Sequence, residues 1–348
     1  MRTRVSLAAA LAFAGCTRAV SGPPAVNAPS AAPLAVASIP APPPARWLGL
    51  LGEYGAGENF RVVAEYDGRL RLIDTALRVT PLTERTDDAF VTAPDATPVR
   101  FTRDQTGRAT ELALGTAKLS RNRIEPEGGA NQLRVTPVRP LSELRAEALA
   151  ATPPSERGPF AASDLVELTT LDSTIRLEIR YATTNNFLGT RFYDEARAFM
   201  QRPAAEALVR ANHSLRPLGF GLLVHDAYRP WYVTKMFWDA TPLDTRWLVA
   251  DPKLGSRHNR GAAVDLTLYD LATLRPVEMP STYDESTDRA YADYPGGTSR
   301  QRWHRALLRR AMEAQGFRVN VHEWWHFDHE SWKSYGIGNV PFSALPVR

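Results

Sequence analysis

The chain has 348 residues, of which 44% are hydrophobic and 23% are charged. These values are ordinary for a globular protein, and the length is sufficient for two domains that each bury a core. The net charge is only +4, and arginine is spread along the chain without a basic run. We therefore expect no binding of nucleic acid.

The first 16 residues are typical of an export signal. Two arginines precede an apolar stretch, residues 5–14, which is too short to cross a bilayer and leads to small residues before Cys16. The setting of Cys16, the only cysteine, resembles the lipobox of bacterial lipoproteins, although Phe13 stands where leucine is usual. We expect lipidation of Cys16, with an ordinary secretory signal as the alternative. In both cases the protein is exported, and a lipid anchor would hold it to a membrane in the periplasm or at the outer surface.

Two further segments precede the part of the chain that carries chemistry. Residues 17–45 consist mainly of Ala, Pro, Ser and Val, a composition that predicts an extended linker. Residues 46–136 alternate apolar and polar positions and predict a small all-β, barrel-like domain. Its clearest signals are two hairpins, 60–66 with 70–73 across Asp67-Gly68 and 99–102 with 109–112. It contains no cluster of potential metal ligands, so we assign it no chemistry.

The pattern changes after a connector at residues 137–160, and residues 161–348 predict an α+β domain. Strands are expected at 165–168, 175–179, 221–225, 264–268 and 317–321, and helices at 203–215, after Pro230 and at 300–315. The polar stretch 280–299 is expected to form a loop over the functional site. His213 and His304 are expected to face solvent from their helices.

Two motifs in this domain predict a metal site. The first is Ser256-Arg257-His258-Asn259-Arg260-Gly261-Ala262-Ala263-Val264-Asp265, and the second is Glu323-Trp324-Trp325-His326. In the first motif Gly261 would let the chain turn from a loop into a strand, which would bring His258 and Asp265 together. With His326 they supply two imidazoles and one carboxylate, the donor set of a catalytic zinc ion that keeps one position open. Glu323 would remain free beside the metal to accept a proton from water.

Other interpretations of single residues remain open at this point. A lone His or Asp is more often a surface or hydrogen-bonding residue than a ligand. Trp324 and Trp325 are expected to be core aromatics, and His225, His322 and His329 stand close enough to the motifs to be considered as ligands. Asp226 either orients a ligand or caps the following helix.

Four motifs in order make the C-terminal half similar to a known family. They are Arg-Tyr-Ala-Thr at 180–183 with Asn-Asn-Phe at 185–187, Asp-Ala-Tyr-Arg-Pro at 226–230, the His258 motif and the His326 motif. Together they resemble the VanX-type D-alanyl-D-alanine dipeptidases, zinc peptidases of the D,D-peptidase and hedgehog-like fold group. The resemblance covers residues 162–348 and leaves the β domain and the linker outside.

The resemblance implies a role for each matching residue. His258, Asp265 and His326 would hold one zinc ion per chain, Glu323 would be the general acid and base, and Arg229 would stabilise charge at the scissile carbonyl. A structural salt bridge is the alternative for Arg229. The resemblance also implies substrate contacts: Ser256 toward the carboxylate, Asp284 toward the ammonium and Tyr181 in the pocket wall.

Three functions are compatible with these residues. The first is zinc-dependent hydrolysis of the free D-Ala-D-Ala dipeptide. The second is a D,D-carboxypeptidase or endopeptidase that acts on longer peptidoglycan peptides with the same metal site. The third is a non-catalytic lipoprotein that binds the cell wall, and the presence of Glu323 beside all three ligands argues against it because a binding protein needs no proton acceptor.

Overall fold

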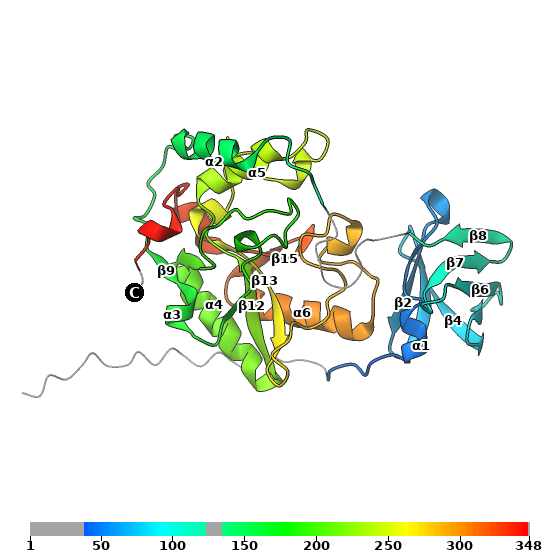
Figure 1. The fold of residues 1–348 in the computed structure, drawn as a ribbon. Coiled ribbons are helices and arrows are strands. Elements are labelled where there is room, and N and C mark those ends of the chain that lie inside the picture. The colour runs from blue at the N-terminus through cyan, green and yellow to red at the C-terminus, as the bar shows by residue number, and fades with distance from the viewer. Residues whose placement is uncertain (1–37, 123–133, 347–348) are drawn as a thin grey trace, which may run out of the picture. The chain divides into compact units, whose positions relative to one another are not determined.

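The computed structural model describes residues 38–122 and 134–346 (Figure 1). The expected signal peptide, the lipidation of Cys16 and most of the linker fall outside the described residues and remain predictions. Within the described ranges, no helix is both long enough and apolar enough to cross a membrane.

The first part of the chain is an eight-stranded antiparallel meander in which each strand pairs with the next. It follows a short helix, α1 (Ala45–Leu48), and contains one 3-10 turn, η1 (Gly57–Asn59). The strands are β1 (Gly52–Tyr54), β2 (Arg61–Tyr66), β3 (Arg69–Asp74), β4 (Val79–Thr86), β5 (Ala89–Thr92), β6 (Pro98–Arg103), β7 (Ala109–Leu114) and β8 (Ala117–Ser120). Both predicted hairpins are confirmed, because β2 pairs with β3 and β6 pairs with β7.

The meander nearly closes on itself, because an isolated bridge joins Tyr54 at the end of β1 to Arg121 just after β8. Tyr54 is fully buried, and its hydroxyl donates to the Leu50 carbonyl at 2.7 Å. The inward positions fill the interior with apolar side chains, among them Val63, Leu72, Phe90, Val99, Phe101 and Leu112. The expected barrel-like β architecture is therefore confirmed.

The second part of the chain is built on a five-stranded mixed sheet with the order β10-β12-β13-β15-β14. Its strands are β10 (Arg176–Leu177), β12 (Phe220–Asp226), β13 (Ala263–Asp270), β14 (Phe317–Asn320) and β15 (Glu323–His329). Only β10 and β12 pair in parallel, and the other neighbours are antiparallel. A separate two-stranded sheet pairs β9 (Leu165–Glu167) with β11 (Phe199–Gln201).

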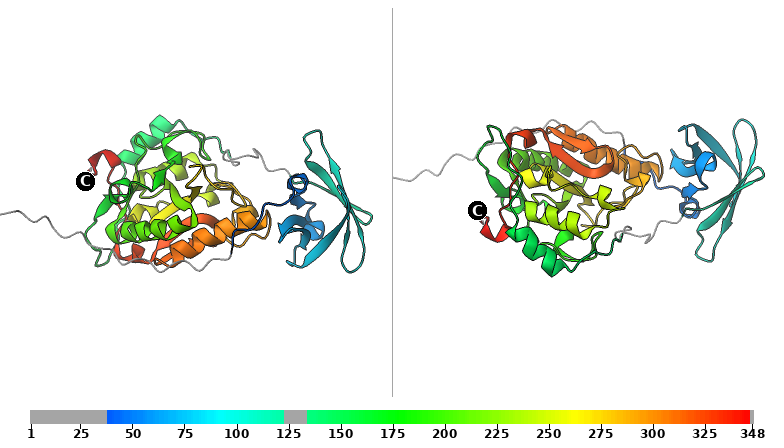
Figure 2. Two further views of the ribbon diagram at one scale, coloured as in Figure 1. Left: turned by 90° about the horizontal axis from the view of Figure 1, so that it is seen from below. Right: turned by 90° about the horizontal axis from the view of Figure 1, so that it is seen from above.

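Helices cover both sides of this mixed sheet. The two longest, α4 (Arg202–Leu215) and α6 (Ser299–Glu313), lie side by side on one face, whereas α5 (Trp231–Ala240) and α2 (Leu141–Ala150) pack together on the other side (Figures 1 and 2). The remaining turns of helix are α3 (Leu168–Leu171), η2 (Arg180–Ala182), η3 (Arg216–Leu218), η4 (Arg246–Leu248), η5 (His258–Arg260), η6 (Asp288–Ala290), η7 (Glu330–Ser334) and η8 (Phe342–Ala344).

Alternation along β13 separates an apolar face from a polar one. Val264, Leu266 and Leu268 are fully buried in the main hydrophobic core, whereas Asp265 and Thr267 point to the opposite face. Cross-strand pairing continues the polar face, because Asp226 on β12 and His326 on β15 are the partners of Asp265. Three neighbouring strands therefore present a row of polar side chains at one place.

The predicted apolar face of helix α6 is confirmed, but the expected exposure of His304 on this helix is wrong. Trp303, Leu307 and Leu308 face inward, and Gly316 follows the helix with φ of +84°, a left-handed conformation that favours glycine. His304 does not face solvent as expected but is buried, with its Nδ1 3.0 Å from the Glu278 carbonyl. This backbone partner offsets the cost of burying the imidazole, which packs against Phe220. His213 does face solvent, because 57% of its side chain is exposed.

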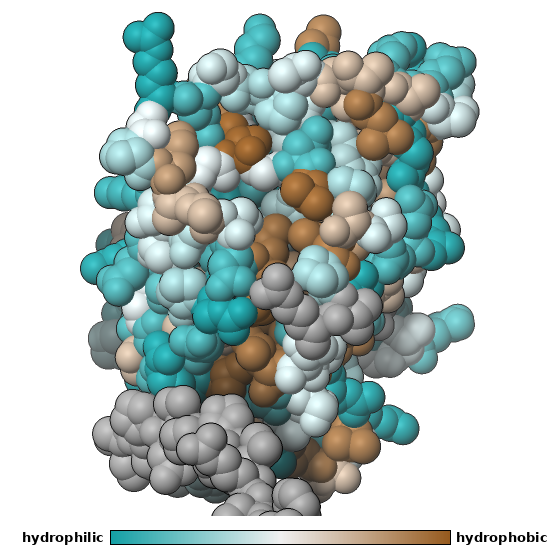
Figure 3. Space-filling model, turned by 90° about the vertical axis from the view of Figure 1, so that its left-hand side faces the viewer, coloured by the Kyte–Doolittle hydropathy of each residue, from teal (hydrophilic) through white to brown (hydrophobic). Residues whose placement is uncertain are grey.

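The surface mixes polar and apolar side chains. On the face in Figure 3, hydrophilic residues cover most of the area and hydrophobic residues gather toward its middle. Among the most exposed large apolar residues are Leu243, Trp247 and Leu254, which all lie in the segment between α5 and η5.

Candidate active site

Three potential ligand atoms form a small triangle at the polar face of the sheet. His258 Nε2 lies 3.2 Å from His326 Nδ1 and 3.4 Å from Asp265 Oδ1, and the third side, from His326 Nδ1 to Asp265 Oδ1, is 2.9 Å. Ligand atoms about 2.0–2.1 Å from a tetrahedral zinc ion are about 3.3 Å apart, so the triangle has the size that the ion requires. The predicted convergence of the two motifs is confirmed.

The local backbone explains why these residues meet. Asp265 and His326 are direct partners in the β13–β15 pairing. His258 reaches them from η5, which ends at Gly261 with φ of +67°. A Cβ atom on Gly261 would lie 2.5 Å from Leu165 Cδ2, so both the conformation and the space require glycine. The turn predicted from the motif is therefore present.

Each of the three side chains also has a second partner that fixes its orientation. His258 Nδ1 lies 2.7 Å from the Ala227 carbonyl, and His326 Nε2 lies 3.1 Å from Asp328 Oδ1. The second oxygen of Asp265 accepts from the Tyr283 hydroxyl at 3.1 Å. Such contacts leave the inward nitrogen of each imidazole free to bind a cation, which is the usual arrangement in metal sites. The donor set and its supporting contacts fit a zinc ion.

Asp328 and Tyr283 were not selected from the sequence. Asp328 follows His326 by two positions on β15, so the alternation of a strand places both side chains on one face and could have identified it. Its own carboxylate forms an ion pair with Arg257. For Tyr283, no spacing in the sequence indicates the contact with Asp265, because the two residues come from a loop and a strand.

Electrostatics in the triangle favours a carboxylate flanked by imidazoles. Burial alone would raise the pKa of Asp265, but the neighbouring His258 and His326 lower it well below its usual range. Asp265 is only 3% exposed. A carboxylate buried to this extent stays ionised only where positive or hydrogen-bond-donating groups surround it. A divalent cation satisfies the same requirement.

Glu323 lies beside the triangle without belonging to it. Its Oε2 is 3.8 Å from His326 Nδ1 and accepts a hydrogen bond from Asn320 Nδ2 at 3.1 Å. Desolvation raises the pKa of Glu323 above its usual range, although 39% of the side chain is exposed to solvent. A carboxylate with a raised pKa is suited to accept and return a proton.

Arg229 is held rigidly at the cavity wall. Its Nε and Nη2 donate to Asp226 Oδ2 at 2.9 and 2.7 Å, and the guanidinium lies over the rings of Tyr181 and Phe237. Nη1 makes no hydrogen bond to any described residue. The salt bridge considered as an alternative exists, but Arg229 also lines the cavity.

The Asp226 carboxylate accepts hydrogen bonds from Arg229 and does not cap α5, whose N-cap is Pro230. Its other oxygen accepts from the Tyr193 hydroxyl at 2.7 Å. The distance to His258 Nδ1 is 3.8 Å, too long for a hydrogen bond. Asp226 therefore orients the arginine and does not directly orient the metal ligand.

The site residues share one cavity of about 340 Å³. Ser256, Tyr181 and Asp284 line it together with the triangle, Glu323 and Arg229, and the segment from Trp247 to Ala250 forms part of its wall. Trp247 is 72% exposed, and nothing in the sequence had pointed to this segment. The structure thus brings together every residue predicted for the site.

Asp284 is an acid in the wall of the cavity. It lies on the loop expected over the site, with φ of +59°, and accepts from the Tyr181 hydroxyl at 3.0 Å. Burial, assisted by the charge of Asp265, raises the pKa of Asp284 to about 8. A carboxyl group in this state gains most from a ligand that brings a positive charge.

The neighbouring histidines that were considered as ligands are not part of the triangle. His225 is buried with its Nδ1 3.4 Å from the Glu178 carbonyl, and burial lowers its pKa to about 3. His329 bonds to Ser331, and His322 is exposed against the ring of Tyr291. Trp324 and Trp325 are buried, as expected for core aromatics.

Two imidazoles and a carboxylate beside a glutamate are a set of side chains typical of hydrolases that activate water with a metal ion. Residues 161–336 match a family model described as D-ala-D-ala dipeptidase, and the chain belongs to this family.

Relatives named D-alanyl-D-alanine dipeptidase support the assignment. The protein of Escherichia coli (strain K12) is 34% identical over 183 residues, which are 53% of this chain and 93% of the relative. Those of Enterococcus faecalis and Streptomyces coelicolor are 33% and 34% identical and cover 44% and 45% of this chain, and 85% and 87% of the relatives. The resemblance noticed in the motifs is confirmed.

Proposed function

We propose that the protein is a zinc-dependent peptidase that hydrolyses the dipeptide D-Ala-D-Ala. The observation that carries the proposal is the His258, Asp265 and His326 triangle, which shares a cavity of about 340 Å³ with Glu323 and Arg229. The names of the relatives supply the substrate, and the cavity supplies groups suited to both charged ends of it.

His258, Asp265 and His326 would hold the zinc ion through one nitrogen or oxygen each. When bound, such an ion supplies a Lewis acid and brings the pKa of water near 7. The second contacts of the ligands, to Ala227, Asp328 and Tyr283, would keep the three donors in place. The domain architecture expected for this chemistry is that of the D,D-peptidase and hedgehog-like group.

Glu323 would act as the general acid and base. Its raised pKa and its contact with Asn320 support a carboxylate that takes a proton from the attacking water. The same group would then return the proton to the leaving amine, so that both proton transfers use one side chain.

Arg229 would stabilise the charge that develops on the scissile carbonyl oxygen. Its Nη1 is free of protein partners among the described residues, and Asp226 fixes the rest of the guanidinium. A donor that is already oriented and shielded from water favours an oxyanion more than a mobile one does.

Two polar groups that line the cavity would select a free dipeptide. Asp284 is suited to an ammonium group and the Ser256 hydroxyl to a carboxylate, and Tyr181 in the wall donates its hydroxyl to Asp284. We further propose, from the signal-type N-terminus, that the enzyme acts outside the cytoplasmic membrane, held by a lipid on Cys16.

Alanine release by the purified, zinc-loaded protein tests the proposal. D-Ala-D-Ala should be hydrolysed, whereas L-Ala-L-Ala and N-acetyl-D-Ala-D-Ala should be poor substrates, and Glu323→Gln should be inactive with zinc still bound. Equal activity on the acetylated dipeptide or on a wall pentapeptide would favour the carboxypeptidase alternative. Absence of hydrolysis of all of them would contradict the proposed function.

A further inference from the structure

Tyr283 is a buried residue next to the active site that does not line the catalytic cavity. It is 4% exposed, and its ring stacks on His225 at 4.8 Å and meets Trp325 edge-on at 5.5 Å. These contacts hold the ring on both sides. A substitution that removes only the hydroxyl leaves these ring contacts in place, so it isolates the part played by the hydroxyl.

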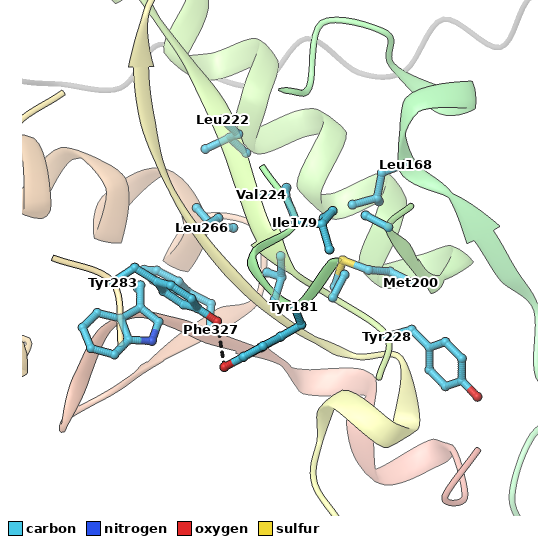
Figure 4. Close-up of a cluster of buried hydrophobic side chains, with 14 of the residues drawn as sticks. Leu168, Ile179, Tyr181, Met200, Leu222, Val224, Tyr228, Leu266, Tyr283 and Phe327 are labelled. Atoms are coloured by element: carbon cyan, nitrogen blue, oxygen red, sulfur yellow. Dashed lines mark hydrogen bonds between the residues drawn. The ribbon is translucent and has the colours of Figure 1, made fainter. Parts of the chain in front are cut away.

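The Tyr283 hydroxyl stands between the metal triangle and the substrate pocket. It lies 3.1 Å from Asp265 Oδ2 and 3.3 Å from the Tyr181 hydroxyl, which in turn is 3.0 Å from Asp284 Oδ2. Figure 4 shows the two phenol oxygens facing one another across the dashed contact. A chain of oxygen atoms thus runs from a metal ligand to the acid suited to the substrate ammonium.

The number of protons in this chain limits its hydrogen bonds. Two hydroxyl protons cannot fill three contacts between four oxygen groups, so one contact lacks a proton when both acids are ionised. Asp265 is the nearer and charged acceptor for Tyr283, and hydrogen bonds to charged groups are the stronger ones. Tyr283 is therefore expected to donate mainly to Asp265 and to share its proton with the more distant Tyr181 oxygen, while Tyr181 donates to Asp284.

The backbone of the loop is adapted to this arrangement. Asp284 follows Tyr283 directly but adopts a left-handed conformation, with φ of +59°. Successive side chains can then reach two different groups, the hydroxyl to Asp265 and the carboxyl to Tyr181. A non-glycine residue in this region is retained where surrounding contacts fix it.

We propose that Tyr283 is a positioning residue whose hydroxyl couples the metal ligand Asp265 to the substrate-binding pair Tyr181 and Asp284. The metal part of the inference depends only on the triangle, whereas the substrate part rests on the proposed dipeptidase function. Loss of the hydroxyl should weaken zinc binding and selection for a free amino end together.

The variant Tyr283→Phe tests the metal part, since it keeps the ring and its contacts with His225 and Trp325. Competition with a chromophoric chelator should show zinc binding weakened by about 10-fold or more, the usual effect of losing such a supporting contact. Tyr269→Phe is the matched control. Like Tyr283, Tyr269 is buried, but it lies on β13 and its hydroxyl donates to the Thr174 carbonyl, away from the site. Unchanged zinc affinity in Tyr283→Phe, or an equal loss in the control, would overturn this role.

The substrate part is tested by selectivity. The ratio of kcat/KM for D-Ala-D-Ala to that for N-acetyl-D-Ala-D-Ala should fall about 3- to 10-fold in Tyr283→Phe, mainly through KM for the free dipeptide. In an Asp284→Asn background the same change should cause no further fall. An independent, additive effect would refute the coupling. If the wild type hydrolyses neither peptide, the proposed function fails, and the zinc comparison still decides whether Tyr283 supports Asp265.

Discussion

Replacing Arg229 with lysine separates its charge from its geometry. The guanidinium uses two nitrogens to hold Asp226 and has Nη1 left for the cavity. An ammonium group keeps the positive charge and can bond to Asp226, but it cannot at the same time reach the scissile carbonyl from a fixed plane. Arg229→Lys should therefore remove the oxyanion contact without leaving Asp226 unpaired.

The expected loss follows from the role of the third nitrogen. Removal of one prealigned oxyanion donor typically lowers kcat by about 100- to 1000-fold, or about 2.7–4 kcal/mol. The free energy of unfolding should fall by less than the roughly 3–5 kcal/mol expected when a buried ion pair loses one partner, because lysine retains the charge. Zinc content should not change, since Arg229 contacts no member of the triangle through its side chain.

Arg197→Lys provides the matched control. Arg197 holds Glu167 through the same two nitrogens, Nε at 3.1 Å and Nη2 at 2.8 Å, and both side chains are largely buried away from the cavity. This variant should lose stability in chemical denaturation but keep kcat. If Arg229→Lys retains kcat within about threefold, or if both variants lose activity equally, Arg229 has no direct part in the reaction.

Four further outcomes are expected. Glu323→Gln should lower kcat by at least about 100-fold while one zinc per chain remains, and wild-type turnover in this variant would exclude its role as the general base. KM for D-Ala-D-Ala should fall as pH rises from about 6 to about 8, because burial keeps Asp284 protonated below its pKa of about 8 and only the carboxylate binds an ammonium. This trend should flatten in Asp284→Asn, and an unchanged pH profile in that variant would assign the titration to another group. Chelation should abolish activity and lower Tm, and added zinc should restore both, because an ion that binds only the folded state stabilises it; full activity after chelation would rule out a metal mechanism. Gly261→Ala should lower Tm and zinc affinity, since its φ of +67° and the nearby Leu165 leave no room for a methyl group; normal zinc binding would show that the turn is not required.

Much of the site was predictable because its residues lie in short motifs next to strong strand signals. Asp265 lies in an apolar run that predicts its strand, and the pairing of that strand with β15 brings Asp265 to His326. The sequence predicts a strand at 317–321, before the His326 motif, but not β15 itself. His258 could be added because Gly261 marks a sharp turn just before Asp265. At these positions the hydrophobic pattern or the turn residue and the choice of metal-binding side chains indicate the same site.

The features that escaped prediction depend on contacts between distant segments. The sequence of the loop does not reveal that the Tyr283 hydroxyl meets Asp265, or that Trp247 lies at the cavity. The prediction that His304 faces solvent was wrong, because a helical pattern alone does not show that the Glu278 carbonyl supplies a partner for the buried imidazole. In the β domain both hairpins were predictable from turn residues, whereas the closure through Tyr54 and Arg121 was not.

The proposed chemistry depends on the binding of one divalent ion by His258, Asp265 and His326. Zinc K-edge X-ray absorption on the purified protein tests it most directly. We expect nitrogen and oxygen neighbours at about 2.0–2.1 Å, with an imidazole signature from two histidines and no sulfur. A sulfur shell, or a spectrum that Asp265→Ala and His326→Ala leave unchanged, would contradict it.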